Sequence, residues 1–404
     1  MTAKPRNHVT DLRGVSRMAI DATIGLTDLV EALHTRIARQ PAGLAGPLVA
    51  GAVQGITGLV YKSIRGVARV AGSGIDAGLA QLGPMLREMG SSPTREALVA
   101  ALNGVLGDYL AETGNPLAIA MQLRRHGRAL ELTPQALAAA IPSPRAKLVV
   151  LVHGLCMNDL QWERDGHDHG AALARDLQCT AVYLHHNSGL HVSTNGQAFA
   201  ARLEALVAAW PVPLEELVIV GHSMGGLLAR SAHHHGTAAQ HRWPRLLRKL
   251  VFLGTPHHGA PLERGGNWID LLLEQTPYTA PFARLGKIRS AGITDLRHGS
   301  VLDEDWQGRD RFARSADPRR PVPLPDGVRC YAIAATTGKS AGDLGDRLLG
   351  DGLVPLASAL GRHDEAGFGL AFAQANQSIA YDTGHLGLLN QPAVYERLRS
   401  WLAD

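Results

Sequence analysis

The chain has 404 residues, which is long for one compact domain and leaves room for an appended segment. Its formal net charge of +4 is small, and no dense basic run with interleaved aromatic residues occurs, which argues against nucleic-acid binding. The cysteines Cys156, Cys179 and Cys330 are odd in number and widely spaced. This spacing argues against a disulfide framework and favours a reducing, cytoplasmic compartment.

Residues 1–114 are expected to form an N-terminal helical segment rich in glycine and alanine. Residues 1–14 are polar and lack the apolar region of a secretory signal peptide. Residues 42–61 carry no charge, and three basic residues follow by position 69. A soluble helical hairpin, an interfacial amphipathic element and a membrane span all fit this pattern. The interfacial alternative would give peripheral membrane contact through residues 42–70.

A helix is predicted over residues 92–112, because serine followed by proline forms its cap and first turn. Residues 118–124 and 128–132 then predict an antiparallel hairpin at the start of a sheet. A second domain is therefore expected to begin near Asn115 and to comprise residues 115–404.

Within that domain, strand-like and helix-like runs alternate. This alternation predicts an α/β fold, with a mostly parallel sheet and helices on both faces. The strands are expected at 147–152, 181–185, 217–221, 249–254 and 328–334, with helices between them, notably 196–210 and 224–235.

Residues 260–326 interrupt the alternation and are much longer than an ordinary connection. Trp268, Leu272 and Phe282 make this insertion apolar, so we expect a lid or cap that lines an acyl-binding pocket. The alternative is a packed excursion with no gating role.

The sequence G-x-S-x-G from Gly221 to Gly225 lies between an apolar, strand-like run and a helix-like run. This order is typical of a nucleophile elbow, a sharp strand-to-helix turn that lifts one serine, here Ser223, clear of the backbone. Glycines at 221 and 225 omit the Cβ atoms that would block the turn, and Gly226 lets the helix approach the sheet.

A nucleophilic serine also needs a base and an acid that orients the base. Asp351 and His385 each lie in a glycine-flanked loop downstream of Ser223, in the chain order Ser, Asp, His. His153 follows the first buried strand, as Ser223 follows a later one. Both therefore lie at the carboxyl ends of parallel strands, where sites of such sheets form.

Together, these motifs resemble the serine esterases and lipases of the α/β-hydrolase superfamily. The resemblance is closest to the triacylglycerol-lipase and PGAP1-like branch, in which a T-P-H-x-G segment and a D-G-x-V-P acid loop recur. It covers roughly residues 117–404 and rests on His153-Gly154, Gly221 to Gly225, Gly254-Thr255-Pro256-His257-His258-Gly259, Asp351 to Pro355 and Gly384-His385.

The resemblance implies that Ser223 is the nucleophile, His385 the base and Asp351 the acid. It also implies that the backbone N–H groups of Leu155 and Met224 form the oxyanion hole. His153 and the apolar residues of the insertion are candidate substrate contacts.

The sequence therefore predicts an esterase or lipase that acts on a small-molecule or lipid ester without a cofactor. An acyltransferase or a thioesterase would use the same residues, and a non-catalytic membrane-associated scaffold is the alternative from another class. No metal site is expected. The histidine runs 233–235 and 257–258 lack an H-E-x-x-H pattern and are interpreted as exposed helix residues.

Overall fold

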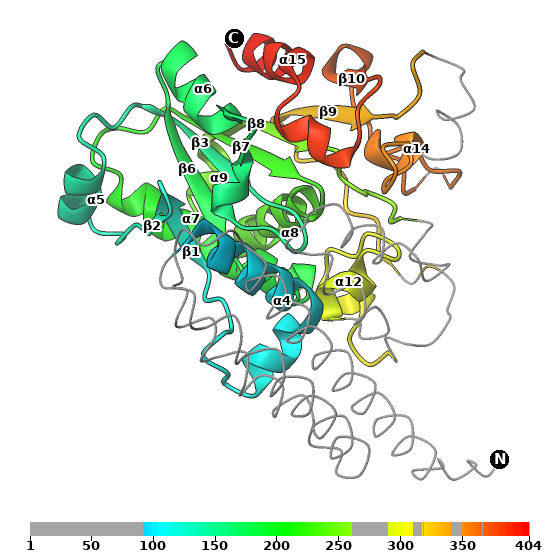
Figure 1. Ribbon diagram of the computed structural model, residues 1–404, viewed down its shortest axis with the longest axis horizontal. Coiled ribbons are helices and arrows are strands. Elements are labelled where there is room, and N and C mark those ends of the chain that lie inside the picture. The colour runs from blue at the N-terminus through cyan, green and yellow to red at the C-terminus, as the bar shows by residue number, and fades with distance from the viewer. Residues whose placement is uncertain are drawn as a thin grey trace, which may run out of the picture. The chain divides into compact units, whose positions relative to one another are not determined.

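The computed structural model of the protein describes residues 92–260, 290–309, 317, 319–340, 350–365 and 367–403 (Figure 1). Several predicted features lie outside these residues: most of the N-terminal segment, the stretch 42–70, and the pocket residues Trp268, Leu272 and Phe282. The insertion 260–326 is described only in part.

The strands of the main sheet are β1 (Gln122–Arg125), β2 (Arg128–Ala129), β3 (Lys147–Val152), β6 (Thr180–His185), β7 (Glu216–His222), β8 (Leu247–Leu253), β9 (Arg329–Ala335) and β10 (Gln377–Ala380). Within the described residues they form an eight-stranded sheet in the order β10-β9-β8-β7-β3-β6-β1-β2. All neighbouring strands from β10 to β6 pair in parallel. β1 runs antiparallel to both β6 and β2, as the predicted hairpin required. A separate antiparallel pair consists of β4 (Glu163–Arg164) and β5 (His167–Asp168).

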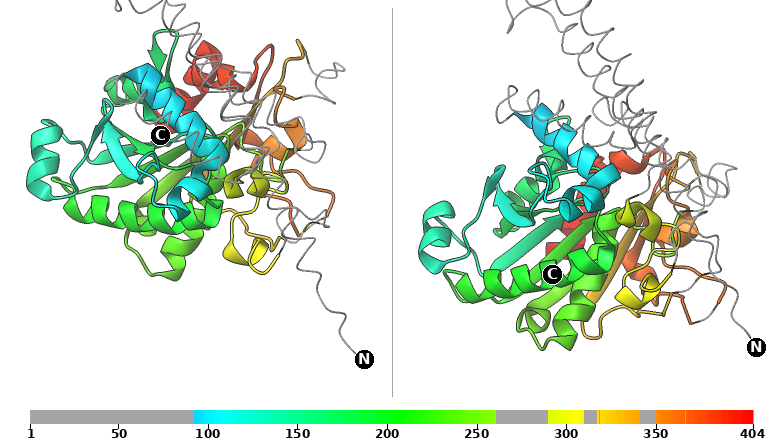
Figure 2. Two further views of the ribbon diagram at one scale, coloured as in Figure 1. Left: turned by 60° about the horizontal axis from the view of Figure 1, so that its bottom comes forward. Right: turned by 90° about the horizontal axis from the view of Figure 1, so that it is seen from below.

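The larger helices that pack on the sheet are α6 (His169–Asp176), α7 (Val192–Ala209), α8 (Met224–Ala238) and α15 (Pro392–Ala403). Figures 1 and 2 show α6 and α15 on one face of the sheet and α7 and α8 on the other. Among the described residues, the remaining helices and 3₁₀ turns are α4 (Pro93–Glu112), α5 (Pro134–Ala140), η1 (Asp159–Trp162), α9 (Trp243–Leu246), α12 (Ala291–Asp295), η3 (Asp303–Asp305), α14 (Leu356–Ala359), η4 (Gln374–Asn376) and η5 (His385–Leu389).

The central strands are buried on both faces because helices cover both. Every residue from Leu148 to Val152 in β3 and from Leu217 to Val220 in β7 is fully buried. One set of alternate residues, including Val149 and Val218, packs with α6 and α15 in a single apolar cluster. The predicted α/β-hydrolase architecture is thereby confirmed, and the five predicted parallel strands agree with the structure to within two residues at each end.

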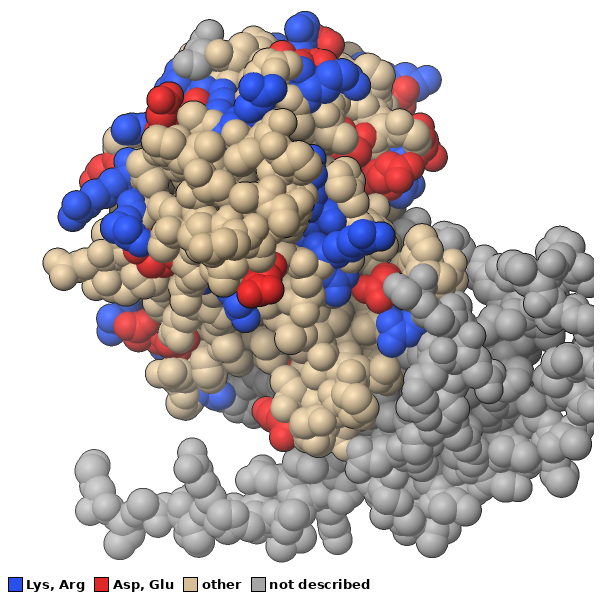
Figure 3. Space-filling model, turned by 90° about the vertical axis from the view of Figure 1, so that its left-hand side faces the viewer, with Lys and Arg blue, Asp and Glu red and all other residues tan. Residues whose placement is uncertain are grey.

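Two properties of the described residues bear on possible partners. No helix among them is both long enough and apolar enough to cross a lipid bilayer. On the face shown in Figure 3, Lys and Arg side chains are interspersed with Asp and Glu around an uncharged area. Positive charge is therefore not gathered into one surface on that face.

Helix α4 contributes most of its length to the compact unit that contains the sheet. This unit begins at Val99, upstream of the boundary expected near Asn115. A Cβ atom at Gly104 would lie 2.2 Å from Cys156 Sγ, and the side-chain amide of Asn187 donates to Gly107 O at 2.9 Å. Cys156 and Asn187 lie in the loops that follow β3 and β6, so α4 supports the carboxyl edge of the sheet at these two loops.

We expect Gly104→Leu to lower the free energy of unfolding by roughly 1–3 kcal/mol, because the added side chain must displace Cys156 and its backbone. Ala111→Leu adds volume to an exposed position of the same helix and should change stability little. Urea unfolding followed by circular dichroism measures both variants. Equal stability of the two would contradict the close packing of α4 against the loop.

Candidate active site

Ser223 occupies the sharp turn between β7 and α8. Its backbone has φ 54° and ψ −126°, a left-handed conformation that is strained for a residue with a side chain. The Ser223 N–H donates to Leu253 O of β8 at 2.8 Å, which ties the turn to the neighbouring strand. The local geometry is that of the predicted elbow.

The glycines around Ser223 allow backbone atoms to approach closely. A Cβ atom at Gly225 would lie 2.2 Å from Val152 O, and one at Gly221 would lie 2.6 Å from the Gly226 nitrogen. At Gly226 a Cβ would meet Thr255 Oγ1 at 2.0 Å. A side chain at Gly221 would block the turn and one at Gly226 would push α8 away from the sheet, as the sequence predicted, whereas one at Gly225 would clash with the end of β3.

Asp351 and His385 are brought together by two loops at the carboxyl edge of the sheet. His385 Nδ1 lies 2.6 Å from Asp351 Oδ2, and both side chains are almost completely buried. The other carboxylate oxygen, Asp351 Oδ1, accepts hydrogen bonds from the N–H groups of Leu353 at 2.9 Å and Val354 at 2.8 Å. These donors fix the carboxylate in one orientation, with Oδ2 toward the imidazole.

Contacts of Gly254 and His222 place this pair beside the elbow. Gly254 follows Leu253, and a Cβ atom on it would lie 3.2 Å from both Asp351 Oδ2 and His385 Cε1. The ring of His222, the residue before Ser223, has its centroid 4.8 Å from that of His385. His385 Nε2 is buried and has no hydrogen-bond partner among the described residues. This nitrogen is therefore available to accept a proton.

The loop after β3 lies against Ser223 on its other side. A Cβ atom at Gly154 would lie 2.9 Å from Ser223 Cβ. Within the described part of the chain, neither Leu155 N–H nor Met224 N–H donates a hydrogen bond, whereas Cys156 N–H donates to Ser188 Oγ at 3.0 Å. Leu155 and Met224 thus keep the unengaged donors that an oxyanion hole requires.

His153 orients the peptide that carries the Leu155 N–H. Its Nδ1 donates to Gly154 O at 2.9 Å, and its Nε2 accepts from His186 N–H at 3.3 Å. Because a trans peptide is planar, holding the Gly154 carbonyl on one side directs the Leu155 N–H to the opposite side. Burial lowers the pKa of His153 to about 3, which keeps the ring neutral and this hydrogen-bond pattern intact. His153 therefore lies behind the loop as a support.

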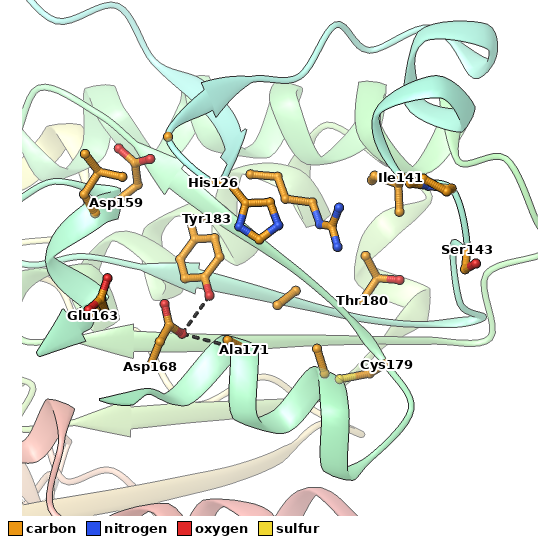
Figure 4. Close-up of a pocket in the computed structure, with 16 residues that line it drawn as sticks. His126, Ile141, Ser143, Asp159, Glu163, Asp168, Ala171, Cys179, Thr180 and Tyr183 are labelled. Atoms are coloured by element: carbon orange, nitrogen blue, oxygen red, sulfur yellow. Dashed lines mark hydrogen bonds between the residues drawn. The ribbon is translucent and has the colours of Figure 1, made fainter. Parts of the chain in front are cut away.

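A separate cavity of about 400 Å³ lies beside β6, with Thr180, Ala181 and Tyr183 of that strand in its lining (Figure 4). Tyr183 points toward Asp168 and donates to its Oδ1 at 2.7 Å, while Asp168 also caps α6 through Ala171 N–H at 2.9 Å. His126 and Asp159 belong to the same lining. Neither the pair of Asp351 and His385 nor the elbow contributes to this cavity, so we do not assign the candidate site to it.

Two other residues lie outside the candidate site. Cys156 is buried, and burial raises the pKa of its thiol to about 12. His257 was predicted to be an exposed helix residue, and this is wrong. It is buried outside any helix, with its ring centroid 4.7 Å from that of Phe252. Among the described residues, no group of three or more His, Cys, Asp or Glu could hold a metal ion.

Comparison with known proteins adds a family match. Residues 145–319 match the family model described as the PGAP1-like alpha/beta domain. No curated protein sequence matches the chain.

Similar solved structures include the mature lipase BlEst2 of Bacillus licheniformis, with 17% identity over 70% of this chain and 98% of that one, at a TM-score of 0.41. Lipase B of Aspergillus fumigatus has 12% identity over 92% of this chain and 83% of that one, at a TM-score of 0.39. Phospholipase PlaB of Legionella pneumophila, in complex with thio-NAD, has 18% identity over 53% and 44%, at a TM-score of 0.34.

The matched residues run from the start of β3 through the elbow and β8, so the family match and the sheet topology describe the same part of the molecule. The match to the PGAP1-like alpha/beta domain thus covers residues 145–319, and the described residues have the α/β-hydrolase fold.

Proposed function

We propose that the protein is a serine carboxylic-ester hydrolase, an esterase or lipase that acts on esters of apolar acyl chains. The observation that carries the proposal is the buried pair of Asp351 and His385 beside the strained Ser223, with His385 Nε2 left without a partner among the described residues. This is the arrangement that activates a serine hydroxyl at neutral pH.

In the proposed reaction, Ser223 Oγ attacks the ester carbonyl carbon while its proton passes to His385 Nε2. Asp351 holds the imidazole through its Nδ1–H and stabilises the imidazolium that forms. The imidazolium then gives the proton to the leaving alcohol as the carbon–oxygen bond breaks, which leaves an acyl-enzyme on Ser223. A water molecule, deprotonated by His385, hydrolyses that ester and restores the free serine.

The tetrahedral intermediates carry negative charge on the former carbonyl oxygen, and we assign its stabilisation to the N–H groups of Leu155 and Met224. Each such donor contributes roughly 3–4 kcal/mol of transition-state stabilisation in hydrolases of this mechanism. Met224 N–H lies in the first turn of α8, where helix N–H groups have no intrahelical acceptor. The helix dipole there also favours negative charge.

A fluorophosphonate probe tests the proposal directly. We expect stoichiometric labelling of Ser223, identified by peptide mass spectrometry, because only an activated hydroxyl reacts readily at neutral pH. Hydrolysis of p-nitrophenyl esters from C2 to C16 would then define the preferred acyl length.

Ser231→Ala is the matched control, because the Ser231 hydroxyl is also buried on α8 but donates to Val301 O at 2.7 Å. Labelling should survive in this variant and disappear in Ser223→Ala. A wild-type protein that neither reacts with the probe nor cleaves any ester of the series would favour the non-catalytic scaffold. Acyl transfer to an added alcohol in preference to water would favour the acyltransferase.

A further inference from the structure

The polar atoms of His385 are held by two residues. Its N–H donates to Asp351 O at 3.1 Å, and its Nδ1–H donates to Asp351 Oδ2 at 2.6 Å. Its carbonyl oxygen lies 3.2 Å from His222 Nε2 and accepts a hydrogen bond from it. Asp351 therefore supplies two of these contacts and His222 the third, which leaves Nε2 for the reaction.

His222 connects the elbow to the segment that carries the base. It is the last residue of β7, directly before Ser223, and it is completely buried. A Cβ atom at Gly154 would lie 3.3 Å from His222 Nδ1, so the opposite edge of the ring faces the loop after β3. One side chain thus touches both the His385 segment and the loop that carries the Leu155 N–H.

The hydrogen bond determines the tautomer of His222. A carbonyl oxygen can only accept, so the proton is on Nε2, and Nδ1 is an acceptor with no partner among the described residues. Burial, followed by the proximity of His385, holds the pKa of His222 well below its usual range. A neutral ring in this position does not repel the imidazolium that His385 becomes during the reaction.

A second buried histidine holds the same segment from α6. His169 Nε2 donates to Leu388 O at 2.9 Å, near the end of η5, and His169 Nδ1 accepts from His167 Nε2 at 2.8 Å. Burial lowers the pKa of His169 to about 4, so it is also a neutral donor. The segment from His385 to Leu389 is therefore fixed by imidazole donors at both ends.

We propose that His222 is a positioning residue for His385: its Nε2–H binds the His385 carbonyl and holds the imidazole in the orientation in which Nε2 faces Ser223. This inference rests on the proposed roles of Ser223 and His385. It assigns a role to a side chain that acts on the reaction only through His385.

Two amide substitutions at His222 distinguish the effect of the hydrogen bond from the effect of side-chain polarity. In His222→Gln the amide nitrogen can occupy the position of Nε2 and donate to the His385 carbonyl. In His222→Asn the shorter amide places its nitrogen near the position of Nδ1 and cannot reach that carbonyl. His222→Met fills the volume with no donor and serves as the second variant if the asparagine protein does not fold.

We expect kcat for a p-nitrophenyl ester to fall about 10–100-fold in His222→Asn and His222→Met, with KM nearly unchanged, because a small misplacement of a catalytic group costs this much. His222→Gln should keep kcat within about threefold of wild type on the same geometric argument. Rates are normalised to the serine titrated by a fluorophosphonate, and thermal melting checks each fold.

The pH dependence of kcat/KM distinguishes a positioning role of His222 from a purely structural one. The acid limb of kcat/KM reports the base of the free enzyme. A loosened His385 bonds Asp351 less well, so its charged form is less stable, and this limb should move to lower pH in His222→Asn but not in His222→Gln. If both donor-free variants keep the wild-type kcat and the wild-type acid limb of kcat/KM, the role of His222 is overturned and the proposed function stands. If the wild-type protein is inactive, the proposed function and the role of His222 are both overturned.

Discussion

His385→Ala is expected to lower kcat for ester hydrolysis by about 10⁶-fold, and Ser223→Ala by about as much, because the two side chains act as one unit. Without the imidazole, the Ser223 hydroxyl has no acceptor for its proton. His385 Nε2 is a buried ring nitrogen beside the elbow and has no hydrogen-bond partner among the described residues. The variants are compared in single-turnover experiments with an activated p-nitrophenyl ester.

The double variant gives the sharper result. If Ser223 and His385 serve one proton transfer, Ser223→Ala combined with His385→Ala should be no slower than either single variant. His234→Ala, at an exposed position on α8, is the control and should retain wild-type kcat. Additive losses in the double variant would mean that the two residues act in separate steps and would contradict the assignment.

The five interior parallel strands could be predicted because each is buried on both faces. A strand in that position must be apolar along its whole length, so Leu148 to Val152 form an unbroken run that is visible in the sequence. The same reasoning explains why β10 was not predicted. Gln377 to Ala380 form a short edge strand that is only partly buried, so its residues carry neither a continuous nor an alternating apolar pattern.

The start of α7 could not be predicted from the sequence for a different reason. The sequence predicted this helix from residue 196, whereas it begins at Val192. His191, at the cap position, makes no side-chain capping bond. Instead Val192 N–H donates to Asp295 Oδ2 at 2.7 Å, and His191 Nδ1 lies 3.0 Å from Asp295 Oδ1. A cap supplied by a carboxylate so distant in the chain leaves no local signal.

Of the candidate site, the sequence could predict the three residues that lie in glycine-flanked turns. Ser223, Asp351 and His385 lie in glycine-flanked turns, and the spacing of those glycines is a local signal. The supporting roles of His153, His169 and His222 could not be predicted in this way. Each depends on which carbonyl the fold brings within reach of an imidazole, and a histidine in a sequence does not indicate its hydrogen-bond partner.

Asp351→Asn is expected to lower kcat by about 10⁴-fold while the fold is retained. The reason is the fixed orientation of the side chain. Asp351 Oδ1 accepts hydrogen bonds from Leu353 N–H and Val354 N–H, and an amide keeps those bonds only if its oxygen stays there. The amide NH₂ must then face His385 Nδ1 from the position of Oδ2, 2.6 Å away in the wild-type structure.

Two donors cannot face each other, so the imidazole in Asp351→Asn is driven to the tautomer that carries its proton on Nε2. That nitrogen can then no longer accept the Ser223 proton, which is why the loss should appear in kcat rather than in KM. Asp364→Asn is the matched control, because Asp364 is exposed in the same stretch of chain. This substitution should leave kcat unchanged. Steady-state hydrolysis of p-nitrophenyl esters, with circular dichroism to confirm the fold, measures both variants. A mild effect in a folded Asp351→Asn protein would show that another group orients His385.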